Sequence, residues 1–246
     1  MSTNIGRTRG WSPALAAIVM AATACLVITG CAPGTSPSPD PTSETSNPGS
    51  TASASASARP ASCDSSADGP TFAVVGDSIT HAESPDFAAG EIDPVSWVTF
   101  VCDEGFVFAG GWAEWGATTA KMTESVVAPV DAETLVLLAG TNDYALAVPF
   151  AETTANLDRI VQTVAIADVV VVSVPPMAAY PKGAPELNQR LEELASARGW
   201  RFVDASAGLR DADGRYQDGM TSDGIHPSEE GSRVLGKAIA EALRDG

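Results

Sequence analysis

Residues of the types that carry out acyl transfer stand at the two ends of one stretch of the chain. Ser78 follows the apolar run 71–76 directly, and a hydroxyl becomes a nucleophile once a base removes its proton. His226 is one of only two histidines, and histidine is the side chain that titrates near neutral pH. Asp223, three residues earlier, can hold one ring nitrogen and stabilise the imidazolium. These types predict a Ser-His-Asp triad, although residues 223–227 taken alone are more typical of a turn before a helix.

Acyl transfer also needs hydrogen-bond donors for the oxyanion. Asn142 lies in Gly-Thr-Asn-Asp after an apolar run, and Gly116 lies just before a predicted helix, where a backbone N–H is free. With the Ser78 N–H, these groups would make an oxyanion hole. His81 has no evident carboxylate to orient it, so we interpret it as incidental to the chemistry.

The elements that must position these residues alternate between strand and helix patterns. Apolar runs predict strands, and 3.6-residue spacing, caps and terminal glycines predict helices. The order suggests parallel βαβ units, whose ligand sites lie beyond the carboxyl ends of the strands. Ser78 and residues 140–143 fall at two such ends. The predicted strands are 71–76, 106–110, 134–140, 168–175 and 201–205, and the predicted helices are 93–105 (opened by Asp93-Pro94), 118–130, 157–164, 187–199 and 229–243 (capped by Ser228).

Four blocks in order resemble the SGNH hydrolases, also called the GDSL esterase/lipase family. They are Gly-Asp-Ser after the first strand, a glycine before the second helix, Gly-Thr-Asn-Asp after the third strand, and Asp-x-x-His-Pro near the end. The likeness covers about residues 71–243. It implies a flavodoxin-like three-layer α/β/α sandwich with a five-stranded parallel sheet, which agrees with the predicted order of elements. It also implies Ser78 as nucleophile, His226 as base, Asp223 as its orienting partner, and Ser78, Gly116 and Asn142 as oxyanion donors.

The second block departs from the family pattern, because it reads "GGWAEWGATT". Gly110 or Gly111 could therefore supply the oxyanion donor in place of Gly116. Trp112 and Trp115 could form an aromatic wall for a sugar ring or an acyl group, or could simply pack in the core. We interpret the motif residues Asp77 and Asp143 as braces for their loops.

The first 30 residues have the layout of an export signal. Arg7 and Arg9 precede an apolar run that is too short to span a bilayer, and no acidic residue occurs before Asp40. The ending Ile-Thr-Gly-Cys resembles a lipobox, which predicts that Cys31 is lipidated; an ordinary cleaved signal and an uncleaved anchor are the alternatives. Residues 31–69 are rich in Ser, Thr, Pro and Ala and predict a disordered linker, followed by one domain over 70–246.

The cysteine content, the net charge and the acidic segments of the chain limit the cofactors and partners that it can have. In an exported protein, the remaining pair Cys63 and Cys102 is expected to form a disulfide. The alternative is that Cys102 is a buried free thiol and that Cys63 has no role. A net charge of −17 argues against nucleic acid as a partner. The segment 211–219 superficially resembles a calcium loop, but it lacks the ligand spacing and favours a hairpin turn. We therefore expect no cofactor and no metal, and a monomer that contacts the membrane only through its lipid anchor.

Together these features predict an extracytoplasmic serine esterase, anchored to the outer face of the membrane, that acts on a small-molecule or polysaccharide ester. The absence of a long apolar lid segment favours short acyl groups, such as acetyl on carbohydrates. The alternatives are a lipase or thioesterase for longer acyl groups, an acyltransferase onto sugar hydroxyls, and a non-catalytic binding module. The complete set of Ser78, Asp223, His226 and Asn142 argues against the last of these.

Overall fold

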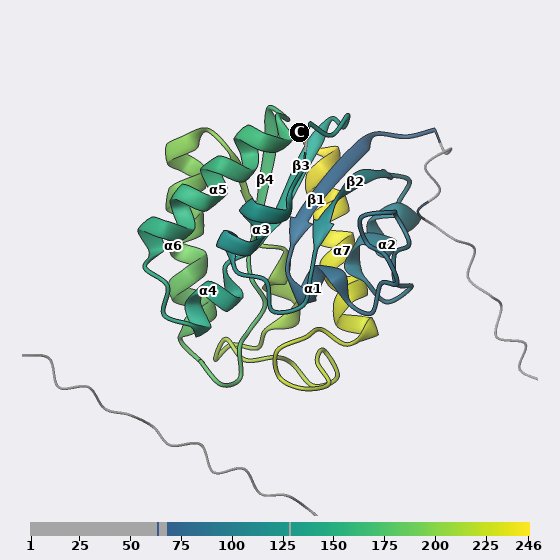
Figure 1. Cartoon of the computed structure of the whole chain (residues 1–246). Coiled ribbons are helices and arrows are strands. Elements are labelled where there is room, and N and C mark those ends of the chain that lie inside the picture. The colour runs from purple at the N-terminus through teal and green to yellow at the C-terminus, as the bar shows by residue number, and fades with distance from the viewer. Residues whose placement is uncertain (1–62, 64–67, 128) are drawn as a thin grey trace, which may run out of the picture. The chain divides into compact units, whose positions relative to one another are not determined.

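A parallel sheet of five strands organises the protein (Figure 1). The computed structural model describes residues 63, 68–127 and 129–246. The strand order is β2-β1-β3-β4-β5, and every neighbouring pair is parallel, which confirms the predicted flavodoxin-like sheet. The strands are β1 (Thr71–Gly76), β2 (Val107–Ala113), β3 (Thr134–Leu138), β4 (Asp168–Val172) and β5 (Arg201–Val203).

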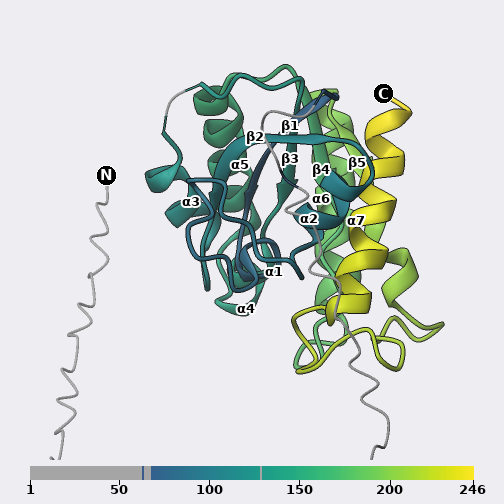
Figure 2. The same cartoon turned by 90° about the vertical axis from the view of Figure 1, so that its right-hand side faces the viewer.

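Helices cover both faces of this sheet, and Figure 2 shows α3 and α7 on opposite sides of the strands. The apolar strand residues alternate between the two faces: Ala73 and Val75 pack with α3, α5 and α6, whereas Phe72 and Val74 pack with α2 and α7. This two-sided burial explains why the strands read as continuous apolar runs. The helices are α1 (Ser78–His81), α2 (Trp97–Asp103), α3 (Thr119–Ser125), α4 (Thr141–Ala145), α5 (Phe150–Val164), α6 (Gly183–Arg198) and α7 (Glu229–Arg244), with a 3-10 helix η1 (Ala205–Leu209).

The start of α2 differs from the prediction. Asp93 does not cap the helix, because its carboxylate accepts the Val95 N–H in a local turn. Ser96 is the N-cap instead, and its hydroxyl accepts the Val98 N–H and donates to the Thr80 carbonyl. The short helices α1 and α4 were also absent from the prediction. The cap that was predicted for α7 is confirmed, since the Ser228 hydroxyl accepts the Gly231 N–H.

A disulfide joins Cys63 to Cys102 and ties the segment before β1 to α2. The predicted signal segment 1–30, with Cys31, and the linker up to residue 62 lie outside the described residues. Within the described part of the chain, no helix is long and apolar enough to cross a membrane.

Candidate active site

Ser78 stands at a sharp corner where β1 ends and α1 begins. Asp77 caps α1, and its Oδ1 accepts the Ile79 N–H at 3.0 Å. A Cβ on Gly76 would lie 2.2 Å from the Thr80 hydroxyl oxygen, so the corner requires a residue without a side chain at this point. The corner places the Ser78 hydroxyl beyond the carboxyl end of β1, which lies between β2 and β3 in the sheet.

The structure brings His226 and Asp223 to Ser78. The Nε2 of His226 lies 2.9 Å from the Ser78 hydroxyl oxygen, and its Nδ1 lies 2.6 Å from Asp223 Oδ2. With Asp223 as the acceptor, Nδ1 carries the proton and Nε2 is free to accept one from Ser78. This is the geometry of a nucleophile, a base and an orienting carboxylate.

The loop of residues 221–227, called the catalytic loop below, holds Asp223 as a carboxylate. Its Oδ1 accepts the backbone N–H groups of Ile225 and His226, both at 2.8 Å. Partial burial would raise its pKa, but the bond from the His226 ring and these two backbone bonds outweigh burial and lower the pKa of Asp223 to about 2. The carboxylate is therefore charged over the whole range in which an imidazole can act as a base.

The two predicted oxyanion donors besides Ser78 follow the ends of β2 and β3, the two strands that flank β1. The side-chain amide of Asn142 donates to the Ala117 carbonyl at 3.0 Å, which leaves its second N–H for a ligand. This bond ties Asn142 to the loop that carries Gly116, whose φ of +68° suits glycine. Among the hydrogen bonds of the described residues, none uses the Gly116 N–H.

The alternative donors Gly110 and Gly111 occupy a different place. Both lie within β2, opposite Ala73 and Val74 of β1. A Cβ on Gly111 would lie 1.9 Å from the Val74 carbonyl oxygen, so this glycine permits close approach of the two strands. The geometry thus favours Gly116, which lies beyond the strand end.

A buried network braces the two donor loops, and the sequence did not reveal most of it. Asp143 accepts the Thr119 N–H at 2.9 Å and the hydroxyls of Thr119 and Thr153 at 2.5 and 3.1 Å. Asn156 donates to the Thr119 hydroxyl at 3.1 Å. The network fixes the start of α3, and hence the Gly116 loop, against α4 and α5. The interpretation of Asp143 as a brace agrees with these contacts, whereas Thr119, Thr153 and Asn156 gave no signal in the sequence.

The two tryptophans of the second block have different surroundings. Trp112 is partly buried and packs against the core on the α3 face. Trp115 is 49% exposed, its ring centroid lies 4.8 Å from that of His226, and its Nε1–H donates to the Ala82 carbonyl at 2.5 Å. His81 also uses the Ala82 carbonyl, through Nδ1 at 2.9 Å, and stacks on Phe87. Only Trp115 therefore forms a wall of the site.

A small pocket of about 220 Å³ opens at Ser78 and His226. Trp115 and Val95 supply apolar surface, while Glu83 and Ser222 supply polar groups. Ligand pockets for drug-sized molecules usually start near ~300 Å³, so this pocket suits a small group.

No cluster of metal-ligating side chains occurs within residues 63, 68–127 and 129–246. The predicted hairpin around 211–219 is present as a tight turn: Arg210 and Tyr216 form an antiparallel bridge, and Asp211 donates its N–H to the Arg215 carbonyl at 2.8 Å.

Comparisons with known proteins agree with this geometry. Residues 74–234 match the model of the GDSL-like lipase/acylhydrolase family. No match was found among curated proteins. Three solved structures share the fold. A Streptococcus pneumonia protein provisionally called a platelet activating factor is 25% identical, with 72% of this chain and 86% of that chain covered and a TM-score of 0.58. A lipase/acylhydrolase from Enterococcus faecalis is 19% identical, with 72% and 96% covered and a TM-score of 0.58. An acetyl-xylooligosaccharide esterase from Geobacillus stearmophilus is 14% identical, with 73% and 96% covered and a TM-score of 0.55.

Proposed function

Because the chain belongs to the GDSL-like lipase/acylhydrolase family, we propose that it is an extracytoplasmic serine esterase that removes short acyl groups, chiefly acetyl, from carbohydrates. The observation that carries this proposal is the small pocket that holds the Ser78–His226 hydrogen bond and has Trp115 as one wall. Its volume of about 220 Å³ supports a short acyl group. The exposed face of Trp115 supports a sugar, because the C–H groups of a sugar ring can pack on an aromatic surface.

In the proposed mechanism, Ser78 Oγ attacks the ester carbonyl carbon while His226 Nε2 takes its proton. The carbonyl oxygen becomes an oxyanion held by the Ser78 N–H, the Gly116 N–H and the free Asn142 amide N–H. As the tetrahedral intermediate collapses, His226 returns the proton to the leaving alcohol and an acyl-Ser78 ester remains. Water then attacks this ester with His226 as base, which releases the carboxylic acid and restores Ser78.

Asp223 acts through His226 and does not touch the substrate. Its carboxylate holds the ring in the tautomer whose Nε2 faces Ser78, and it stabilises the imidazolium that forms in each half-reaction. Trp115 covers one side of the same ring and limits its rotation.

The test is hydrolysis of p-nitrophenyl esters from C2 to C16 by the full chain. We expect turnover to fall as the acyl chain lengthens and to be abolished in Ser78→Ala. Ser196→Ala is the matched control, because this exposed serine of α6 does not line the pocket, and it should keep its activity. A long-chain optimum would assign the site to lipid esters and reject the acetyl proposal. Turnover that survives in Ser78→Ala would reject Ser78 as nucleophile.

We further propose that the protein is exported and held at the membrane by a lipid on Cys31. The disulfide between Cys63 and Cys102 supports export, because such bonds are rare in reducing compartments. Metabolic labelling with a palmitate analogue, comparing the natural chain with Cys31→Ser, tests the anchor. We expect label and membrane association in the natural chain alone; label that persists without Cys31 would reject this site.

A further inference from the structure

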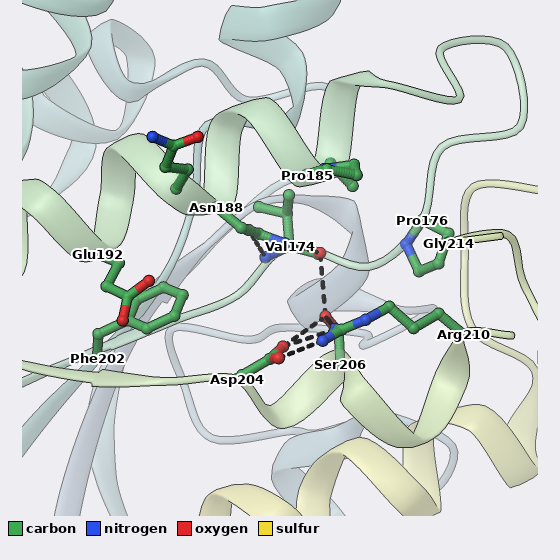
Figure 3. Close-up of a pocket in the computed structure, with 12 residues that line it drawn as sticks. Val174, Pro176, Pro185, Asn188, Glu192, Phe202, Asp204, Ser206, Arg210 and Gly214 are labelled. Atoms are coloured by element: carbon green, nitrogen blue, oxygen red, sulfur yellow. Dashed lines mark hydrogen bonds and ion pairs between the residues drawn. The ribbon is translucent and has the colours of Figure 1, made fainter. Parts of the chain in front are cut away.

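A second pocket, which Ser78 does not line, lies beyond the carboxyl ends of β4 and β5 (Figure 3). It measures about 280 Å³ and lies between α6, the end of β5 and the start of η1, with Gly214 of the 211–216 turn at its rim. We call it the β4–β5 pocket. Its position follows the rule that ligands of such sheets bind beyond the carboxyl ends of strands, but none of the predicted catalytic residues lines it.

The pocket combines an aromatic surface with a polar floor. Phe202 supplies the aromatic surface, and Figure 3 shows the carboxylate of Asp204 directed toward Ser206 and Arg210. Val174 and Pro185 add apolar surface on the opposite wall. A ligand with both apolar faces and polar edges fits this lining.

The polar groups are held in fixed positions. The Asn188 amide accepts the Val174 N–H at 2.7 Å and donates to the Val174 carbonyl at 3.0 Å, so its orientation is set and one N–H remains. Arg210 forms a two-pronged ion pair with Asp204 and donates to the Ser206 hydroxyl at 3.2 Å. The guanidinium retains two N–H groups and the carboxylate retains free lone pairs. Both donors and acceptors are thus available without rearrangement.

Charge disfavours an anionic ligand. Arg210 and Asp204 compensate each other, while Glu192 is exposed and makes no ion pair with another described residue, so the pocket carries an excess negative charge. An anion would be repelled by this charge and by the net charge of −17 of the chain. Hydroxyl groups can both donate to and accept from these side chains, which makes a neutral sugar the best match.

A third hollow, of about 210 Å³, adjoins the β4–β5 pocket and reaches the loop that carries His226. This hollow shares Pro176 and Gly214 with the β4–β5 pocket, and Thr221 and Gly224 of the catalytic loop line its other end. The same loop supplies Asp223 and His226 to the active-site pocket. One loop thus contributes residues both to the hollow beside the β4–β5 pocket and to the active-site pocket, and hollows placed on neighbouring segments suit a polymer better than a small molecule.

We propose that the β4–β5 pocket is a remote subsite that binds a neutral sugar unit of the glycan whose ester is cleaved at Ser78. The inference rests on the proposed carbohydrate-esterase function. It adds that the enzyme recognises the glycan chain at a distance from the ester. No covalent step takes place in this pocket.

Two variants test the subsite. In Asp204→Ala/Arg210→Ala both partners of the ion pair are removed, so neither charge is left alone. In Glu192→Ala an exposed side chain without an ion pair is removed, which should not disturb folding. The matched control is Asp158→Ala/Arg198→Ala, which removes an ion pair of the same two-pronged type between α5 and α6, at 2.9 and 2.8 Å, outside the pocket.

The first measurement compares an acetylated polysaccharide with p-nitrophenyl acetate. We expect the KM for acetylated xylan to rise about 5- to 20-fold in the double variant and less in Glu192→Ala, with kcat unchanged, because hydrogen bonds to charged groups are lost. Kinetics with p-nitrophenyl acetate should not change, and the control should match the natural chain with both substrates. Equal KM values for the pocket variants and the control would overturn the proposal.

The second measurement does not depend on catalysis. Ser78→Ala protein, with and without the pocket variants, is titrated by NMR with neutral hexasaccharides of xylose, glucose, mannose and N-acetylglucosamine. We expect at least one to bind and the pocket variants to weaken it. No binding of any hexasaccharide, or binding only of a basic peptide used as a comparison, would overturn the subsite. If binding depends on the pocket but no ester is hydrolysed, the proposed function fails and the sugar-binding pocket stands.

Discussion

Asp77, next to the nucleophile, should make the protein less stable as the pH rises through the neutral range. Its carboxyl is fully buried, and burial raises its pKa from the ordinary value of 3.8 to about 7. The negative charge of Asp143 adds to the rise, while the Ile79 N–H and His226 oppose it. Among the described residues, neither Asp77 Oδ2 nor the buried Thr141 hydroxyl has a hydrogen-bond partner.

The sign of this pH dependence follows from the state of the chain, folded or unfolded, in which Asp77 holds its proton more tightly. Between about pH 4 and 7 the unfolded chain has lost the Asp77 proton while the folded protein keeps it, so the free energy of unfolding falls as the pH rises. A difference of about 3 pH units corresponds to about 4 kcal/mol, because each unit is worth about 1.4 kcal/mol. This loss is absent below about pH 4 and complete above about pH 7.

Asp77→Asn isolates this effect. An asparagine can still accept the Ile79 N–H as a helix cap, and its amide can donate toward Thr141, but it cannot ionise. We expect the variant and the natural protein to have similar free energies of unfolding near pH 4, and the variant to be more stable by up to ~4 kcal/mol near pH 8. Urea unfolding at one-unit pH intervals gives the difference curve directly.

The matched control is Asp86→Asn. Asp86 is exposed and also accepts a backbone N–H, from Ala89 at 3.0 Å, so it tests the loss of a cap-like carboxylate without the burial. Its difference curve should be flat over the same pH range. A flat curve for Asp77→Asn as well would refute the reasoning, since it would mean that the buried carboxyl is solvated or already paired.

Three further predictions concern the site and its supports. Asn142→Ala should lower kcat for p-nitrophenyl acetate by about 10²–10³, because one oxyanion donor is lost, with little change in KM; an unchanged kcat would remove Asn142 from the oxyanion hole. Asp143→Ala should lower the free energy of unfolding by about 3 kcal/mol in urea, because the Thr119 and Thr153 hydroxyls lose a buried acceptor; a change below ~0.5 kcal/mol would contradict its bracing role. Cys63→Ser should lower the free energy of unfolding by about 4 kcal/mol, the chain-entropy value for a separation of 39 residues, and reductant should then have no further effect; unchanged stability would contradict this.

Some parts of the fold were predictable because their signal is local. Strands buried on both faces leave continuous apolar runs, and α7 carries its serine cap and its amphipathic spacing in the sequence. The helices α1 and α4 have four and five residues, which is too short for a periodic pattern. Their existence depends on the corners at which they begin.

The start of α2 depended on contacts across the fold. Both Asp93 and Ser96 are good capping residues, so the local sequence cannot choose between them. The choice follows from tertiary bonds: the Ser96 hydroxyl donates to the Thr80 carbonyl at 2.7 Å, and Trp97 Nε1–H donates to the Thr80 hydroxyl at 3.2 Å. These contacts join α2 to the corner that carries Ser78.

The residues of the candidate site that lie within the motif blocks could be predicted from the sequence. The parallel topology brings strand ends to one edge, and there the structure joins Ser78, His226 and Asp223 by hydrogen bonds, with Asn142 beyond the end of the neighbouring strand β3. The different roles of Trp112 and Trp115 could not be read, because they depend on where β2 ends. Trp112 is still within the strand and packs inward, while Trp115 follows the strand end at Ala113 and reaches the catalytic histidine.

The loop between β2 and α3 therefore determines more of the site than its sequence suggests. Trp115 joins it to the corner after Ser78 through the Ala82 carbonyl, and Ala117 joins it to Asn142. Gly116 lies between these two anchor points, so the backbone N–H proposed for the oxyanion is fixed from both sides. The same loop packs on His226 through the Trp115 ring. The proposed nucleophile, base and oxyanion donors are thus all contacted or carried by one short segment. This explains how residues from distant parts of the chain can keep the geometry that the proposed acyl transfer requires to within about 0.5 Å.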